Sequence, residues 1–335
     1  MSKTKLLDGV KKVTNQREFF IIALVAVVYI VAGSFNENFL SKGNQLALLM
    51  SVATLLVLGV GVTPLMIAGC FDMSIASILA LSGGLASSAA ISGWPTWACI
   101  ALGLTAGALM GAFNGFFVSY GEMPAFVVTL ATKNMFRGLL LAVTQGHSLV
   151  GFPANYTAIG QSQILGIQLP ILFAAFFVII GAMLLKRLRF FRQCFFIGGN
   201  EKAAKLSGIR VKRTKFLLYV FLGIMAGFAG IITTARYGSC MTTTGENMEL
   251  SVITGTIIGG ASMNGGSGSI VGMFFGVLLM TSVTNIMNIF GADIFWQTFI
   301  EGIALFGAIC LDQVTKMNRK RSVRREAEAL LRKQR

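Results

Sequence analysis

Long apolar runs recur along this 335-residue chain, and they limit its fold more than any other feature. Each run is near 20 residues long, and a helix of that length spans about 30 Å, the thickness of the hydrocarbon layer of a bilayer. The composition agrees, because 55% of the residues are hydrophobic and only 12% are charged. That charge is too sparse for the surface of a soluble protein of this length. The sequence therefore predicts an all-α polytopic membrane protein.

About ten transmembrane or re-entrant helices are predicted. Two of the apolar runs, 73–91 and 250–261, are short or rich in small polar residues. Broken and re-entrant helices have this character, and they occur at membrane depth only where they are buried in protein or line a cavity. The predicted spans are 19–34, 46–68, 73–91, 94–120, 124–143, 169–185, 216–235, 250–261, 268–289 and 294–311.

Lysine and arginine are gathered in three short segments. Residues 1–18, 186–215 and 312–335 hold 24 of the 28 basic residues, in a chain of net charge +15. Short loops rich in these residues stay cytoplasmic during insertion, so the clusters indicate topology rather than nucleic-acid binding. An even number of predicted spans separates each cluster from the next, which places all three in the cytoplasm. The chain then divides into a basic N-terminus, a membrane domain (19–311) and a basic tail that could also touch anionic lipid.

Motifs for enzymatic chemistry are missing from the sequence. The five cysteines are scattered and the single His147 has no acidic or thiol neighbour, so neither a disulfide framework nor a metal site is predicted. No GxxxxGK[ST] phosphate loop or serine-nucleophile elbow occurs, so any ATP-driven work must come from a partner. With the topology above, Cys240 should react with an impermeant thiol reagent from outside, and Cys194, in the basic segment, should not.

A few charged residues lie near or within the apolar runs, where an unpaired charge costs roughly 2.5 to 3.5 kcal/mol at the bilayer centre. Lys133 and Arg137 are four residues apart and therefore share one face of a helix. They either line a polar pathway or form interhelical ion pairs, and the sequence leaves both possibilities open. The charged residues in question are Asp72, Glu122, Lys133, Arg137, Glu249, Asp293 and Glu301.

Two parts of the chain echo one another. The tripeptide DMS at 72–74 and the tripeptide ELS at 249–251 each open a small apolar run that ends in a glycine pair. Transporter halves often repeat in this way. Glycines also recur four apart, on one helix face, where they are expected to let two helix backbones approach closely. A sliding gate is the alternative interpretation of these glycines, which stand at positions 107, 111, 115, 268, 272 and 276.

The basic segment 186–215 contains one short predicted helix, residues 201–207. Asn200 is a good N-cap, Glu201 lies in the first turn, where the helix dipole favours an anion, and Gly208 stands at the C-terminal cap. Such a helix cannot build a core of its own, and its apolar side is too small for strong binding to lipid. We therefore expect it to dock in another protein. Its small apolar surface is formed by Ala203, Ala204 and Leu206.

These motifs together resemble a transporter family. GGNEKAAKLSGI, at 198–209, is similar to the cytoplasmic coupling loop of bacterial ABC importer permeases, specifically the branch that carries ribose, other simple sugars and autoinducer-2. Further segments resemble that family in the same order, over about residues 45–312. They are AGCFDMSIASILALSG, FNG, MPAFVVTLATKNMFRG and ENMELSVITGTIIGGASMNGGSGSIVG. Cys70 and Ala76 depart from the pattern, because glycine is usual at both places.

The resemblance implies a multi-pass permease subunit of an ATP-driven importer in the bacterial inner membrane, which moves a monosaccharide or a similar small polar solute. Two ABC ATPase subunits that bind ATP and Mg²⁺, an external solute-binding protein and a second permease subunit, identical or paired, are the implied partners. This chain itself would hold no cofactor. Coupling to the ATPase would fall to Asn200, Glu201, Ala203, Ala204 and Gly208. The translocation pathway would be lined or supported by Asp72, Ser74, Asn114, Thr129, Arg137 and Glu249.

Two basic residues, Arg236 and Lys42, lie in predicted external loops, against the positive-inside trend. Arg236 either docks the binding protein by holding a carboxylate, or pairs with Glu246 or Glu249 in its own loop. Lys42 is assigned to the same docking surface.

An ATP-independent secondary transporter or channel stays open as the alternative function. A proton- or sodium-coupled carrier usually needs a carboxylate or His relay near the membrane midplane. Only Asp72, near a predicted span end, offers itself for that role. The identity of the solute and the choice between a homodimer and a heterodimer are not encoded in any pattern of this sequence.

Overall fold

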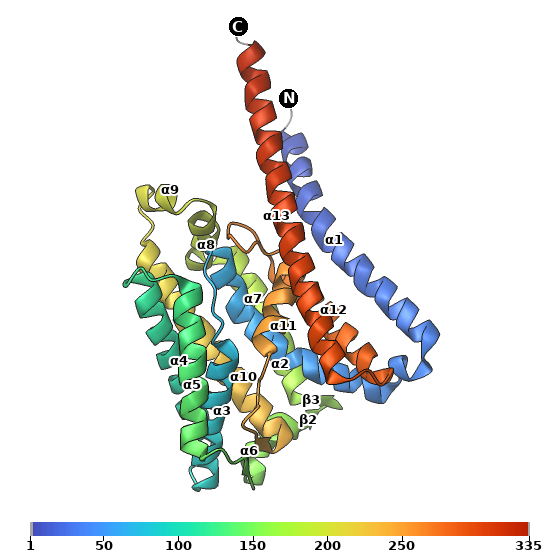
Figure 1. Ribbon diagram of the computed structural model, residues 1–335, viewed down its shortest axis with the longest axis vertical. Coiled ribbons are helices and arrows are strands. Elements are labelled where there is room, and N and C mark those ends of the chain that lie inside the picture. Colours follow the sequence, from blue (N-terminus) through green and yellow to red (C-terminus); the bar gives the residue numbers. More distant parts are fainter. Residues whose placement is uncertain (1–2, 334–335) are drawn as a thin grey trace.

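The computed structural model describes the backbone of residues 3–333 and the side chains of residues 18–314 and Met317. The basic segments 1–18 and 312–335, expected in the cytoplasm, lie largely outside the described side chains. The chain is almost entirely helical (Figure 1). The helices are α1 (Lys3–Phe35), η1 (Glu37–Leu40), α2 (Lys42–Ile67), α3 (Ile75–Ile91), α4 (Thr96–Ser119), α5 (Ala125–Thr144), α6 (Ala154–Gln161), α7 (Leu169–Arg187), α8 (Arg189–Gly199), α9 (Glu201–Leu206), α10 (Val211–Tyr237), α11 (Met248–Ile258), α12 (Ile270–Ile289) and α13 (Ile294–Lys333).

Within the described residues, eight helices are long and apolar enough to cross a bilayer, and α3 and α11 are two shorter apolar helices. These two coincide with the runs predicted to be broken or re-entrant. The predicted all-α polytopic membrane fold is thereby confirmed. In Figure 1, α8, α9 and both chain ends lie at one end of the bundle, called the basic end here, and α6 lies at the opposite end.

Four two-residue strands lie in the loops of the opposite end. Strand β1 (Leu149–Val150) pairs antiparallel with β4 (Ser239–Cys240), with Leu149 opposite Cys240. Strands β2 (Gln163–Ile164) and β3 (Ile167–Gln168) form a hairpin just before α7. The β1–β4 pair ties the loop after α5 to the loop after α10.

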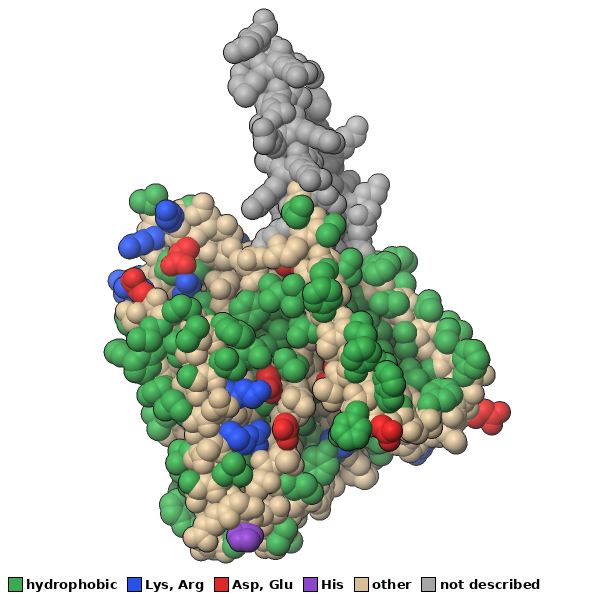
Figure 2. Space-filling model, viewed as in Figure 1, with side chains coloured by type: hydrophobic (Ala, Val, Ile, Leu, Met, Phe, Trp, Pro, Cys, Tyr) green, Lys and Arg blue, Asp and Glu red, His purple; other side chains and the backbone are tan. Residues whose placement is uncertain are grey.

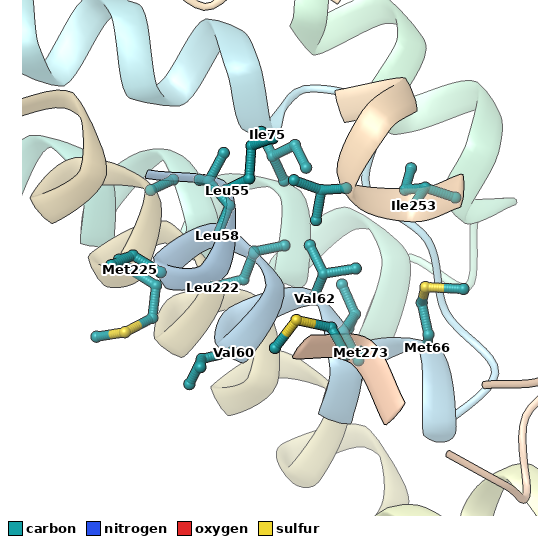
Figure 3. Packing of buried hydrophobic residues seen from close by; sticks show 14 of the residues in the cluster. Leu55, Leu58, Val60, Val62, Met66, Ile75, Leu222, Met225, Ile253 and Met273 are labelled. Atoms are coloured by element: carbon teal, nitrogen blue, oxygen red, sulfur yellow. The ribbon is translucent and has the colours of Figure 1, made fainter. Parts of the chain in front are cut away.

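The long helices α2 and α10 form the centre of the bundle. In α2, 78% of the most apolar window is buried, and in α10 the value is 67%, against 28% for α4. A helix that is apolar on every side belongs in such a buried position. Figure 3 shows Leu58 and Val62 of α2 among Leu222 of α10 and Met273 of α12, all members of one buried cluster.

Glycines bring α4 and α10 into backbone contact. Gly107 and Gly111 of α4 face Gly223 and Gly227 of α10, and a Cβ on Gly227 would lie 2.8 Å from the carbonyl oxygen of Gly103. Helices of a membrane bundle associate through such small-residue faces. The glycines of α12 meet the backbone of α11 in the same way. The structure thus gives the regularly spaced glycines a packing role.

The connection before α3, which contains Gly69, and the glycine-rich connection after α11 touch each other at the basic end. The N–H of Gly266 donates a hydrogen bond to the Ile67 carbonyl oxygen at 2.8 Å. A Cβ on Gly265 would lie 2.8 Å from the backbone nitrogen of Gly69. Both Gly69 and Gly265 have positive φ, at +78° and +84°, a conformation that favours glycine. The two connections therefore need glycine both for their conformation and for their contact.

The basic segment holds two helices, of which only α9 was predicted. In α8, Phe191, Cys194 and Ile197 are three residues apart and all buried, so a helical pattern was present in RFFRQCFFIGG. Burial raises the pKa of the Cys194 thiol to about 12, and it also raises the pKa of the buried Cys240 thiol. The expected labelling contrast between these two thiols is therefore corrected: the structure shields both from reagents.

Candidate functional site

The first polar cluster lies at the start of α3 and joins three of the predicted pathway residues. The Oδ1 atom of Asp72 accepts hydrogen bonds from the Ser74 N–H at 2.7 Å and from the Ser74 hydroxyl at 2.6 Å. The Asn114 amide, from α4, donates to Asp72 Oδ2 at 3.0 Å and to Ser74 Oγ at 2.8 Å. All three side chains are buried. The network fixes the connection before α3 against α4.

The second polar cluster joins α5 to the connection between α10 and α11. Lys133 Nζ forms an ion pair with Glu249 Oε1. Arg137 donates from Nη1 to the carbonyl oxygens of Thr242 and Thr244, at 2.9 Å each. Glu249 is fully buried, whereas the Lys133 side chain is 34% exposed. Lys133 therefore forms an interhelical ion pair at the edge of the buried core, whereas the recorded bonds of Arg137 go to backbone carbonyl oxygens.

Each cluster places a buried carboxylate at the beginning of a short apolar helix. Asp72 lies two residues before the N-cap of α3, Ser74, and Glu249 lies in the first turn of α11. A helix N-terminus carries a partial positive charge, which favours a carboxylate there. The echo between the two segments thus has a structural counterpart. Thr129, also predicted for the pathway, belongs to neither cluster, because its hydroxyl donates to the Ala125 carbonyl oxygen of its own helix at 2.8 Å.

Helix α9 begins and ends with the predicted caps. The Asn200 side chain accepts a hydrogen bond from the Ala203 N–H at 3.1 Å. At the other end Gly208 has φ +81°, and the N–H of Ile209 bonds to the Ala204 carbonyl oxygen at 3.1 Å, as in a Schellman motif. Glu201 pairs with Lys215 of α10 at 2.6 Å. The short helix is therefore held in a defined orientation by its caps and by α10.

The two sides of α9 have different surroundings. Ala204 is 3% exposed and packs into the main core of this chain, so it holds α9 in place. Leu206 is 90% exposed, and Ala203 beside it is also exposed. The side that a partner can reach is therefore formed by Leu206 and Ala203. Composition marked all three residues as apolar, but only the structure separates the inward side from the outward side.

Arg236 and Lys42 lie toward the opposite end, in different environments. Arg236, at the end of α10, donates from Nη1 to the Met50 carbonyl oxygen at 2.7 Å, and its guanidinium lies 5.1 Å from the centre of the Tyr237 ring. The sequence offered Glu249 as one possible partner of Arg236, but Glu249 pairs with Lys133 instead. Lys42 is the exposed first residue of α2.

A cavity with both polar and apolar lining near Arg236 was not predicted from the sequence. It has a volume of about 270 Å³ and lies between α2, α10, α11, α12 and α13. Its walls come from α2 and from the four consecutive helices α10 to α13, so no local pattern could have revealed it. Below the region of α9, Figure 2 shows a few charged side chains across the middle of a face that mixes hydrophobic and other side chains. The polar lining includes Ser51, Arg236, Glu246, Ser251, Thr284 and Glu301.

Known proteins resemble this chain along most of its length. It is 37% identical over 289 residues to the ribose import permease protein of Bacillus subtilis (strain 168), which covers 86% of this chain and 90% of the relative. It is 30% identical over 371 residues to the xylose transport system permease protein of Escherichia coli (strain K12), covering 92% and 94%. The D-allose transport system permease protein of the same strain is 30% identical over 298 residues, covering 88% and 90%.

A family profile also matches the chain, whereas no solved structure matches it. The matching family is described as "Branched-chain amino acid transport system / permease component", and the match spans residues 44–309. This range runs from the start of α2 into α13 and contains both polar clusters and α9. The chain therefore belongs to the branched-chain amino acid transport system permease component family of multi-pass membrane proteins.

Proposed function

We propose that the chain is the permease subunit of an ATP-driven ABC importer that translocates a monosaccharide or a similar small polar solute. Relatives named for the import of ribose, xylose and allose align with nearly the whole chain, which supports this solute class. The observation that carries the proposal is α9, a capped helix that is anchored by Ala204 and presents the exposed Leu206 at the basic end. A helix of this form suits docking in a partner subunit.

The proposal includes the partners on both sides of the membrane. Two ABC ATPase subunits, with ATP and Mg²⁺ bound to them, would receive α9 at the basic end, which would face the cytoplasm. An external solute-binding protein would dock at the opposite end, with Lys42 and Arg236 as contacts, and a second permease subunit would complete the pathway. The basic clusters support this orientation, because such loops stay in the cytoplasm.

The route from α9 to the polar clusters passes through close backbone contacts. Gly198, near the end of α8, touches both glycine-rich connections, because a Cβ on it would overlap the Ile67 carbonyl oxygen and lie 2.9 Å from the Gly265 Cα. One connection leads to Asp72 at the start of α3, and the other follows α11, whose first turn holds Glu249. A displacement of α9 would therefore be transmitted to both short helices without an intervening flexible side chain.

Reconstitution tests the function directly. The chain would be purified with the ATPase and the binding protein encoded beside it and placed in proteoliposomes containing ATP and Mg²⁺. Uptake of radiolabelled D-ribose, D-xylose or D-allose is expected to require ATP, the binding protein and an intact Walker lysine in the ATPase. Uptake of the same magnitude without the ATPase would overturn the importer proposal and favour the ATP-independent transporter or channel.

A further inference from the structure

The polar cavity at the opposite end is separate from the residues proposed to line the pathway. Its volume of about 270 Å³ is several times the roughly 30 Å³ that a water molecule occupies in the liquid. It lies between five helices. Four of them, α2, α10, α12 and α13, are long enough to cross the bilayer, and the fifth is the short helix α11. Polar side chains are costly in such a region unless they are paired or solvated. Several charged and hydroxyl side chains therefore gather around this cavity, although apolar groups form the larger part of its surface.

One wall of the cavity supplies hydrogen-bond acceptors. The Ser251 and Thr284 hydroxyls approach Oε1 of Glu301, at 3.3 Å and 3.5 Å. Neither of these bonds uses Oε2, so the carboxylate can accept further hydrogen bonds. Glu246 adds a second carboxylate to the lining. The hydroxyl groups of Ser251 and Thr284 can each donate or accept a hydrogen bond.

The facing wall supplies donors and an apolar surface. Arg236 has five N–H groups, and the bond recorded from Nη1 to Met50 uses one of them. The Tyr237 ring packs beside the guanidinium and also lines the cavity. A site that combines charged hydrogen-bonding groups with an aromatic surface suits a small solute with polar edges and apolar faces.

We propose that this cavity binds one neutral, polyhydroxylated solute of the monosaccharide class on the outer side of each permease subunit. The proposal rests on the proposed function and adds a binding site to it. Sugar hydroxyls donate and accept together, which matches the mixture of carboxylates, hydroxyls and guanidinium in the lining. The solute would occupy the cavity after release at the opposite end and before it passes the two polar clusters.

The charges of the cavity disfavour other solutes. The lining holds two carboxylates, Glu246 and Glu301, and the guanidinium of Arg236, and Arg137 lies close enough to interact with Glu246, so the opposite charges nearly balance and favour a neutral solute over a phosphorylated sugar. Among the described residues, no group of three or more His, Cys, Asp or Glu side chains could hold a metal ion. The lining also includes apolar side chains, among them Leu55, Met280 and Ile294. A branched-chain amino acid is therefore the competing solute that the test has to exclude, because the family description names such amino acids.

Protection of an introduced cysteine tests the site without the ATPase. Thr298 lines the cavity and its hydroxyl bonds only to its own helix in the recorded contacts, so Thr298→Cys would leave the Glu301 contacts intact. The same protein would carry Cys310→Ser, because Cys310 is exposed and would also be labelled, whereas the other four native cysteines are buried. The purified chain in nanodiscs would be labelled with a hydrophilic methanethiosulfonate reagent. D-ribose, D-xylose and D-allose, each at high millimolar concentration, would be the probes.

At least one of these sugars is expected to slow labelling at position 298 several-fold, whereas ribose 5-phosphate and L-leucine should leave the rate unchanged. Ser148→Cys, at an exposed loop position of the same end, should label equally fast with or without sugar. Adding Glu301→Ala should remove the protection, and Glu37→Ala, which removes an exposed acid at the same end, should not. The thermal unfolding midpoint of each variant would establish that it is folded.

Two results would overturn the cavity proposal. One is the absence of protection by all three sugars in folded protein, and the other is equal protection by ribose 5-phosphate or L-leucine. These results are distinguishable from failure of the proposed function, because labelling needs neither ATP nor a partner. ATP-dependent uptake without protection would remove the cavity site alone, and protection without ATP dependence would leave the site standing in an ATP-independent transporter.

Discussion

Gly198 lies so close to Ile67 that a Cβ on the glycine would overlap the Ile67 carbonyl oxygen. The contact joins the end of α8 to the end of α2. Gly265, in the connection after α11, also contacts Gly198. Three segments that are distant in the chain therefore meet through backbone atoms alone. Such a junction leaves no room for a side chain at Gly198.

Gly198→Ala tests this junction. The added methyl group would force the three backbones apart, and overpacking of this kind costs about 1–3 kcal/mol. We expect a lower thermal unfolding midpoint and a loss of coupled sugar uptake. Gly199→Ala is the matched control, because a Cβ on Gly199 meets no atom within 4 Å. Equal effects of the two substitutions on stability and uptake would show that the close contact is unimportant.

The pairing of Lys133 with Glu249 gives a second prediction. Lys133→Met would leave the fully buried Glu249 without its cation, and removing one partner of a buried pair costs about 3–5 kcal/mol. Because Lys133 is partly exposed, a loss near the lower end of that range is expected in chemical unfolding experiments. The double variant with Glu249→Met should recover much of the lost stability, since no charge is then left unpaired.

Lys212→Met supplies the control for this experiment. Lys212 and Glu122 form a pair at 2.6 Å near the basic end, with side chains 51% and 71% exposed. Lys212 beside Glu122 holds the pKa of that carboxyl below its usual value. Pairs between exposed side chains contribute little to stability because water screens them, so little change in stability is expected. A loss as large as that of Lys133→Met would mean that burial of Glu249 does not decide the outcome.

The two sides of α9 give a third prediction. Leu206→Asp places a charge on the 90% exposed side and should leave the unfolding midpoint of the isolated chain unchanged. Co-purification with the ATPase subunit should fall strongly, because the docking surface is small. Ala204→Asp places the charge in the core of this chain instead, and it should lower the midpoint. Normal ATPase binding by the Leu206→Asp variant would remove α9 from the coupling role.

Local rules predicted the helical features well. The N-cap at Asn200, the positive φ at Gly208 and the short helices α3 and α11 all follow from residue type and spacing along the chain. Helix α8 was missed because Arg189 and Arg192 at its start favoured a solvated basic loop, although its buried residues have helical spacing. Propensity and periodicity act over a few residues, which is why this level of structure could be predicted.

Contacts between distant segments could be predicted only as residue types. The family resemblance assigned Asp72, Ser74 and Asn114 to the pathway, but their mutual hydrogen bonds depend on how α4 packs beside α3. The same holds for the cavity, because Glu301 and Ser251 become neighbours only through the packing of α13 on α11. Arg236 shows the limit most clearly: its bond to Met50 joins residues 186 positions apart.

The last prediction concerns docking of the external binding protein, for which Lys42 provides the cleaner test. Arg236 lines the cavity and bonds to Met50, so its substitution would disturb the solute site and the fold together with any docking surface. Lys42 is exposed at the start of α2, and Lys42→Glu reverses a charge that a partner carboxylate could reach. Stimulation of the assembled ATPase by the loaded binding protein should drop at low salt, and the difference from the unaltered protein should shrink as salt rises, because a charge at the rim of an interface acts through screened electrostatics. Basal ATPase activity should persist. Stimulation that is unchanged at low salt would show that Lys42 lies outside the docking surface, and a defect that is insensitive to salt would point to a change in the fold rather than to docking.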